Sequence, residues 1–113
     1  MAGAGIPPRE FKAGDIIFKV GDDARELFVI QSGKVEIPLG NRVLETLSDY
    51  NIFGEMALID ASPRSATAVA LTDVTVAPIK EKQFLFLVKH MPMFGLRVMR
   101  VLAKRLRRQN KAV

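Results

Sequence analysis

The chain has 113 residues, which is the usual length of one domain, and 49% hydrophobic with 26% charged residues is a composition typical of soluble globular proteins. It contains no cysteine, which excludes disulfides, thiolate metal ligands and a cysteine nucleophile and fits a reducing cytoplasm. The formal net charge of +5 is uneven, because seven Lys and Arg residues lie within the last 17 positions, and the sequence shows neither a membrane-spanning apolar run nor a signal peptide.

Residues 1–10 open with small residues and are expected to form a flexible N-terminal segment. From Phe11 to Ile79 the sequence consists of short strand-like runs punctuated by turn residues, a pattern typical of an all-β barrel or sandwich. Gly40–Asn41 separates two of these runs by only two residues, which accept the positive φ angles of a tight hairpin. The predicted strands are Asp15–Phe18, Glu26–Gln31, Lys34–Leu39, Arg42–Leu47, Ala66–Leu71 and Val74–Ile79.

After Ile79 the hydrophobic period changes from two towards 3.6, which predicts a change from sheet to helix. The first helix is predicted from about Glu81 to His90, and Pro92 then interrupts it. A second amphipathic helix is predicted from near Phe94 to about residue 111, with its arginines outward. The expected fold is therefore mainly β with C-terminal helices: a β-roll, or jelly-roll barrel, over residues 11–79, followed by helices over residues 81–111.

The segment Phe53–Thr67 resembles neither a strand nor an ordinary loop. Met56–Ile59 are good helix formers, and Pro63 ends any helix that precedes it, so a single helical turn is expected inside the β domain. The N–H groups at the start of such a turn lack intrahelical partners and lie along a favourable dipole. They therefore suit a phosphate oxygen.

Two charged residues of this segment indicate a nucleotide ligand. The guanidinium of Arg64 can bind phosphate through paired charge-assisted hydrogen bonds, and Ser65 can add a hydroxyl donor. The carboxylate of Glu55 would repel phosphate, so beside an anion site it is expected to bind another group, such as a sugar hydroxyl. Taken singly, Arg64 could equally be a surface arginine and Glu55 a helix-capping residue.

The run Phe-Gly-Glu-Met-Ala-Leu-Ile-x-x-x-Pro-Arg-Ser-Ala-Thr over residues 53–67 resembles the phosphate-binding cassette of the cyclic-nucleotide-binding domain family. That family includes catabolite-activator-type regulators, the regulatory subunits of cAMP-dependent kinase and cyclic-nucleotide-gated channels. The similarity extends from Phe11 to about Arg108, and residues 13–18, 21–22, 27–30 and 33–35 are similar to the first strands and turns of the family.

Carried over by position, the resemblance implies that Glu55 accepts a hydrogen bond from the ribose 2′-hydroxyl and that Arg64 binds the charged phosphate oxygens. Leu58 would relay the presence of the ligand to the following helices, and the helix Phe94–Lys111 would move over the pocket as a lid. The residues implied to bind the ligand are Phe53, Gly54, Glu55, Met56, Ala57, Leu58, Pro63, Arg64, Ser65 and Ala66. In this set, Gly54 would allow close backbone approach and the Ala57 amide would face the phosphate.

Two positions depart from the family pattern. Ala61 stands where glycine is frequent, so the turn before Pro63 is expected to be less relaxed. Ser65 stands where some relatives have a threonine that favours guanine, which favours cAMP over cGMP here.

We therefore expect a cytoplasmic regulatory module that binds cAMP or cGMP, has no enzymatic activity and signals to an unknown protein partner through its last helix. No DNA-binding domain is expected, and the long apolar stripe of the last helix would allow a homodimer. The alternative is a nucleotide-free β-roll that acts as a protein-interaction module through its basic helix Arg97–Lys111.

Metal binding is not expected, because His90 is the only histidine and there is no cysteine. Four glutamates lie on or beside predicted strands as solvent-facing alternates, and no pattern pairs them into an acid/base site. These residues are Glu10, Glu26, Glu36 and Glu45.

Overall fold

The computed structural model describes residues 6–60 and 62–112, except for the side chains of Arg105 and of residues 108–112. The chain divides into two compact units, residues 1–80 and residues 81–113, and each is described by itself.

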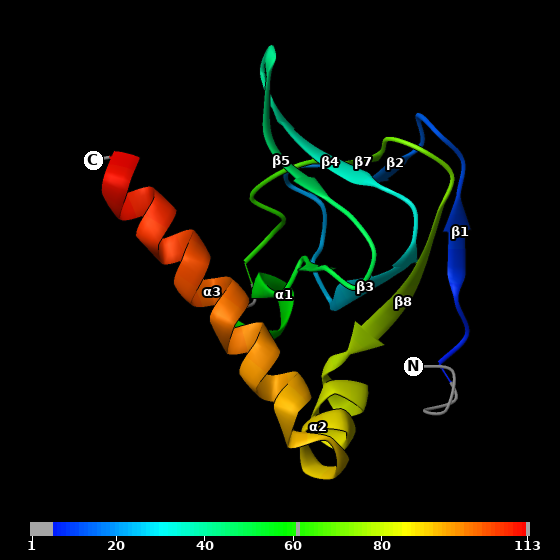
Figure 1. The fold of residues 1–113 in the computed structure, drawn as a ribbon, viewed down its shortest axis with the longest axis vertical. Helices are drawn as coiled ribbons and strands as arrows, with labels where there is room; N and C mark the ends of the chain where they lie inside the picture. The colour runs from blue at the N-terminus through cyan, green and yellow to red at the C-terminus, as the bar shows by residue number, and fades with distance from the viewer. Residues whose placement is uncertain (1–5, 61, 113) are drawn as a thin grey trace. The chain divides into compact units, whose positions relative to one another are not determined.

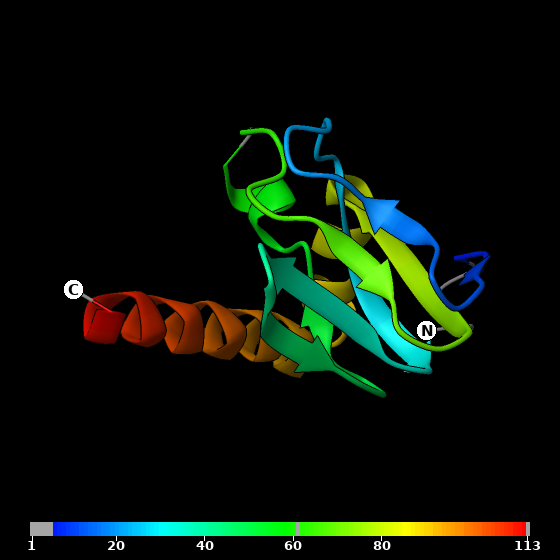
Figure 2. The ribbon, with the colours of Figure 1, turned by 90° about the horizontal axis from the view of Figure 1, so that it is seen from above.

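The first unit is built from two four-stranded sheets in which every strand pair is antiparallel. Figures 1 and 2 show the strands curling around a shared interior, which confirms the predicted β-roll. In spatial order, one sheet contains β1 (Arg9–Phe11), β8 (Val74–Lys80), β3 (Glu26–Ser32) and β6 (Ile52–Phe53), and the other contains β2 (Ile16–Phe18), β7 (Ala68–Ala70), β4 (Val35–Leu39) and β5 (Arg42–Leu47).

The hydrophobic core lies between the two sheets and takes residues from both. Phe28 on β3 and Val76 on β8 pack into the same cluster as Val35 and Ile37 on β4. Along β4 the side chains alternate, with Val35 and Ile37 buried and Glu36 between them half-buried. Burial of one such aliphatic side chain contributes about 1.5–3 kcal/mol, so this alternation fixes which face of the strand is turned inward.

The boundaries of several strands differ from the prediction. Residues 9 and 10 belong to β1, which pairs with β8, so the expected flexible segment 1–10 is wrong for these two residues. β1 and β6 were not predicted: β1 begins in the segment expected to be flexible, and the two residues of β6 are too few to show a hydrophobic period. The predicted strand Ala66–Leu71 shortens to Ala68–Ala70.

The pairing of β4 with β5 contains a β-bulge. Ile37 pairs with Glu45, whereas Pro38 pairs with Val43, so Leu44 is an extra residue in β5. Pro38 has no N–H to donate to a neighbouring strand, which favours such an irregularity at this point. β5 is the outermost strand of its sheet, and its bulge therefore lies on an open sheet edge.

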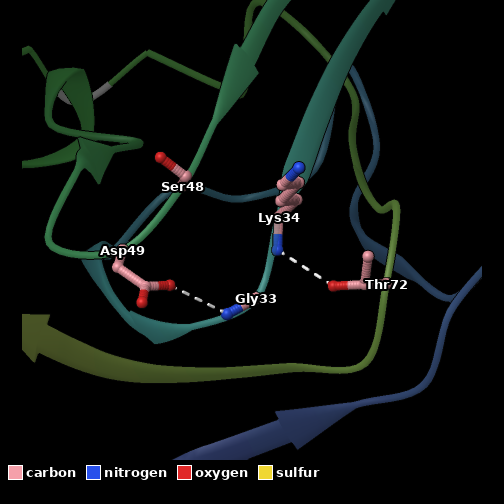
Figure 3. Close-up of a pocket in the computed structure, with 5 residues that line it drawn as sticks. All are labelled: Gly33, Lys34, Ser48, Asp49 and Thr72. Carbon is pink, nitrogen blue, oxygen red and sulfur yellow. Dashed lines mark hydrogen bonds between the residues drawn. The ribbon is translucent and has the colours of Figure 1, made fainter.

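Three turns of the first unit meet beside Gly33. This glycine has φ +100, and a Cβ there would collide with the carbonyl oxygen of Asp73. The amide of Gly33 donates to Asp49 Oδ1 at 3.1 Å, and the amide of Lys34 donates to Thr72 Oγ1 at 3.0 Å. Figure 3 shows these bonds beside an open depression of about 400 Å³ lined by Gly33, Lys34, Ser48, Asp49 and Thr72. The polar groups of this depression tie the turns together.

Replacing Thr72 by valine is expected to lower the free energy of unfolding by about 1 kcal/mol, because the Lys34 amide loses its acceptor while the shape of the side chain is kept. Urea denaturation measures the change. Thr46→Val, at an exposed position of β5, is the control and should leave the midpoint unchanged. Equal midpoints for both variants would show that the turns do not depend on the Thr72 hydroxyl.

The second unit consists of two helices, α2 (Glu81–His90) and α3 (Pro92–Ala112). Phe84 and Phe94 pack with ring centroids 5.9 Å apart. α3 begins at Pro92 rather than near Phe94, because a proline is well tolerated in the first turn of a helix, where its missing N–H costs nothing. Among the helices in the described part of the chain, none has the length and apolarity to cross a membrane.

Candidate functional site

The predicted helical turn is confirmed as α1 (Met56–Ile59). Gly54 precedes it with φ +73, a left-handed conformation that glycine adopts without strain. Glu55 occupies the N-cap position of α1, but its side chain makes no capping hydrogen bond. The helix-capping interpretation of Glu55 is therefore wrong, and this carboxylate is instead fully buried.

The backbone amides of α1 are less available than expected. Ala57 N–H donates to the carbonyl oxygen of Gly54, and Leu58 N–H donates to that of Glu55, each at 3.2 Å. Short helices close their first turn with such hydrogen bonds between residues three positions apart, as in a 3₁₀ helix. These bonds satisfy N–H groups that would otherwise lack a partner. The expectation of unengaged amides therefore fails at these two residues, although both bonds are at the long end of the usual range.

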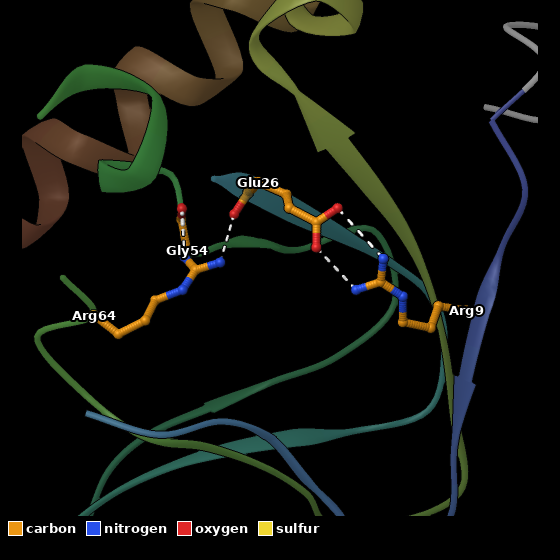
Figure 4. A network of polar contacts seen from close by, with 4 residues as sticks. All are labelled: Arg9, Glu26, Gly54 and Arg64. Atoms are coloured by element: carbon orange, nitrogen blue, oxygen red, sulfur yellow. Dashed lines mark hydrogen bonds and ion pairs between the residues drawn. The ribbon is translucent and has the colours of Figure 1, made fainter. Parts of the chain in front are cut away.

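Arg64 is 8% exposed and is held by groups that lie far from it in the sequence. Its Nη1 donates to the carbonyl oxygen of Gly54 at 3.1 Å, and its Nη2 donates to that of Glu26 at 2.8 Å (Figure 4). Its Cζ lies 4.1 Å from the ring centroid of Phe18, within the range of a cation–π contact. The interpretation of Arg64 as an ordinary surface arginine is therefore wrong.

The backbone of Arg64 is fixed as well. Its N–H donates to the carbonyl oxygen of Asp22 at 2.8 Å, and its carbonyl oxygen accepts from the Gly21 N–H, also at 2.8 Å. Val20 N–H donates to the hydroxyl oxygen of Thr67 at 3.0 Å. These three bonds join the turn after β2 to the segment that contains Arg64, so hydrogen bonds on both sides fix the main chain of this residue.

Burial lowers the pKa of Arg64 because it removes water from the guanidinium, and the nearby carboxylates of Glu26, Asp22 and Glu55 oppose this shift. Arginine keeps its proton under all ordinary conditions, so the site holds a positive charge. The buried Nε of Arg64 makes no hydrogen bond to the described residues. A guanidinium has five N–H donors, and the side-chain hydrogen bonds described above use only two of them.

The structure brings together only part of the predicted set. Gly54 and Arg64 are hydrogen-bonded, and the charge of Glu55 acts on Arg64. Phe53 instead belongs to the core, where its ring centroid lies 5.2 Å from that of Phe28, and Ala66 packs against the same cluster. For the other predicted residues, no contact between a side chain and Arg64 is described. Met56, Pro63 and Ser65 are exposed, and Ala57 and Leu58 are half-buried.

The sequence analysis did not predict that Phe18 and Glu26 contact Arg64. Phe18 has the pattern of a core residue, and the contact of Glu26 is made by its main chain, which no side-chain pattern reveals. The expectation that Glu26 faces solvent is also wrong, because its side chain is 17% exposed and forms an ion pair with Arg9 at 2.9 Å. Ala61, expected to make a strained turn, lies outside the described residues.

The described side chains include no group of three or more His, Asp or Glu that could hold a metal ion. The candidate site consists of two buried groups near the start of α1: the charged guanidinium of Arg64 and the carboxylate of Glu55.

Comparisons with known proteins give this geometry a context. The chain is 36% identical over 104 residues to the cyclic AMP receptor protein of Thermus thermophilus, an alignment that covers 88% of this chain and 48% of that protein. The chain thus spans about half the length of this relative. The crystal structure of the Thermus thermophilus catabolite activator protein superposes with a TM-score of 0.82 at 33% identity, covering 95% of this chain and 53% of the other.

The EAL enzyme Bd1971 has been solved in a cAMP-bound and a cGMP-bound form, each with a TM-score of 0.67 to this chain. The identities are 37% and 36%, and each alignment covers 94% of this chain and about 30% of the enzyme. The profile of the cyclic nucleotide-binding domain matches residues 8–91, which include both sheets, α1 and Arg64. Because this match extends over most of the sequence, the chain belongs to the cyclic nucleotide-binding domain family.

Proposed function

We propose that this chain binds a cyclic nucleotide at Gly54, Glu55 and Arg64 and acts as a regulatory module rather than as an enzyme. The observation that carries the proposal is the buried guanidinium of Arg64, which is positively charged and retains hydrogen-bond donors. In a partly dry site, charge-assisted bonds from such a fork to a phosphate are stronger than on an open surface.

The roles of the individual residues follow from chemistry and from the family. Arg64 binds the exocyclic phosphate oxygens, and Ser65, which is exposed beside it, donates to the same group. Glu55 accepts a hydrogen bond from the ribose hydroxyl. Gly54 supports the approach of the ligand, because a side chain at this position would contact Nη1 of Arg64.

Signalling would depend on the second unit. In this proposal Leu58 senses the phosphate, and α3 moves over the ligand, so nucleotide changes the populations of two arrangements that a protein partner distinguishes. The apolar stripe of α3 also offers a surface for a homodimer. The regulator is proposed to work in the cytoplasm.

Titration calorimetry of the purified chain with cAMP and with cGMP tests the proposal, with 5′-AMP as the non-cyclic control. We expect saturable binding of both cyclic nucleotides at micromolar concentration or below, tighter for cAMP because Ser65 replaces the threonine that favours guanine. The cAMP-bound and cGMP-bound forms of Bd1971 support the expectation that both nucleotides bind. Absence of binding by both would refute the proposal.

The charge distribution favours a second candidate function. Residues 81–113 carry nine Lys and Arg and one Glu, whereas residues 1–80 carry eight Lys and Arg and eleven Asp and Glu. Arg100, Lys104 and Arg107 are exposed on α3. A nucleotide-free chain would then bind an acidic partner through this helix. Heparin chromatography tests this function. The chain should elute at a much lower salt concentration after Arg100, Lys104 and Arg107 are changed to glutamine.

A further inference from the structure

We propose that Arg9 is a positioning residue for the anion site: it holds the carboxylate of Glu26 away from Arg64 and thereby leaves the guanidinium of Arg64 available to an anionic ligand. The inference deepens the proposed function and rests on it. It concerns a residue of the first strand that lies outside the segment Phe53–Thr67.

Glu26 lies between two arginines and binds them with different groups (Figure 4). Its carboxylate faces Arg9, with Nη1–Oε1 at 2.9 Å and Nη2–Oε2 at 3.4 Å, which is a fork-to-fork arrangement. Its main-chain carbonyl oxygen accepts from Nη2 of Arg64 at 2.8 Å. The neutral oxygen of Glu26 is therefore used for Arg64, and the charged oxygens are used for Arg9.

This division matters because Glu26 is close enough to act on Arg64. Three carboxylates raise the pKa of Arg64 and so oppose the effect of burial, and that of Glu26 has the largest influence. A carboxylate that turned towards Arg64 would compete with a phosphate for the same N–H donors. Pairing with Arg9 prevents this turn and neutralises the carboxylate, so the positive charge of Arg64 is directed to the ligand.

The surroundings hold Arg9 in the required place. It lies on β1, where it pairs with Val76 of β8. Its Cζ is 5.8 Å from the ring centroid of Phe28, and the Cζ of Arg64 is 5.5 Å from the same centroid. One aromatic ring thus supports both guanidiniums, while the partly buried side chain of Glu26 is 17% exposed and has little freedom to escape into water.

The test is a mutant cycle of Arg9→Gln and Glu26→Gln, with cAMP affinity measured by calorimetry. Arg9→Gln should weaken binding roughly 3- to 10-fold, because a half-buried carboxylate loses its partner and competes for Arg64. Glu26→Gln keeps the main-chain acceptor, so it should bind at least as tightly as the wild type. The double variant should regain wild-type affinity to within about twofold.

Arg25→Gln is the matched control, because it breaks an ion pair to Asp23 (3.8 Å) whose two side chains are 82% and 86% exposed. It should leave cAMP affinity unchanged. Thermal unfolding of all four variants separates loss of folded protein from loss of affinity. If Arg9 merely stabilised the fold, the double variant would remain as weak as Arg9→Gln, and this result would overturn the proposal.

A second measurement needs no ligand and therefore distinguishes failure of this inference from failure of the proposed function. The Nε–H resonance of Arg64 in a ¹H–¹⁵N spectrum of the ligand-free protein should shift in Arg9→Gln, as the Glu26 carboxylate turns towards it, and should return in the double variant. An unchanged resonance in Arg9→Gln would overturn the inference, even if the wild type binds cAMP.

Discussion

Replacement of Arg64 by alanine is expected to weaken cAMP binding by about 2–4 kcal/mol, or roughly 30- to 1,000-fold, the usual cost of removing one partner of a buried charged pair. The loss is large because Arg64 is 8% exposed, so water cannot easily replace it around the phosphate. Calorimetry with cAMP measures the affinity, and circular dichroism checks that the variant is folded.

Two further variants separate charge from geometry. Arg64→Lys keeps the positive charge, but a single ammonium cannot bind the carbonyl oxygens of Gly54 and Glu26 while also presenting a fork to the ligand. It should therefore bind between the wild type and Arg64→Ala. Arg25→Ala removes an exposed arginine and should have no effect. If a folded Arg64→Ala variant bound cAMP with wild-type affinity, Arg64 would not be a ligand-binding residue.

The second large effect is expected for Gly54→Ala. At φ +73 any side chain is strained, at a cost of about 1–3 kcal/mol in stability. In addition, the new Cβ would lie 2.8 Å from Nη1 of Arg64, which is closer than such atoms approach. Arg64 must then leave its hydrogen bond to the Gly54 carbonyl, so we expect cAMP affinity to fall at least tenfold.

Gly40→Ala is the matched control for this variant. Gly40 has a similar φ of +63, and a Cβ built there has no neighbour within 4 Å. Both variants should therefore lose stability in urea denaturation through backbone strain, and Gly54→Ala should lose more because its Cβ also displaces Arg64; only Gly54→Ala should lose affinity. Equal cAMP affinities for the two variants would show that the contact of Gly54 with Arg64 does not position the ligand group.

The parts of the molecule that follow a local pattern could be predicted from the sequence. Alternation along β4 and the helix-forming run Met56–Ile59 depend on neighbouring residues, and both appear in the structure. β6 has two residues and therefore shows no period. Its position depends on pairing with β3, which is a long-range contact.

The same distinction applies to the candidate site. Arg64 was predicted from the chemistry of its side chain and Gly54 from the resemblance of its segment to the family cassette, and the structure places the two in contact. Phe18 and Glu26 were not predicted as neighbours of Arg64, because 46 and 38 positions separate them from it and only the closure of the roll brings them together. A strand pattern tells which side chains are buried, but it does not tell which main-chain oxygen meets which guanidinium.

The bulge at Leu44 has a consequence for the behaviour of concentrated protein. Val43 and Leu44 are 51% and 58% exposed on the outermost strand of their sheet, a combination that usually promotes aggregation. The inserted residue breaks the regular spacing of donors and acceptors that an incoming strand would have to match. The bulge thereby keeps this hydrophobic edge strand from pairing with strands of other molecules. Deletion of Leu44, which would remove the bulge, is expected to make the protein aggregate and precipitate.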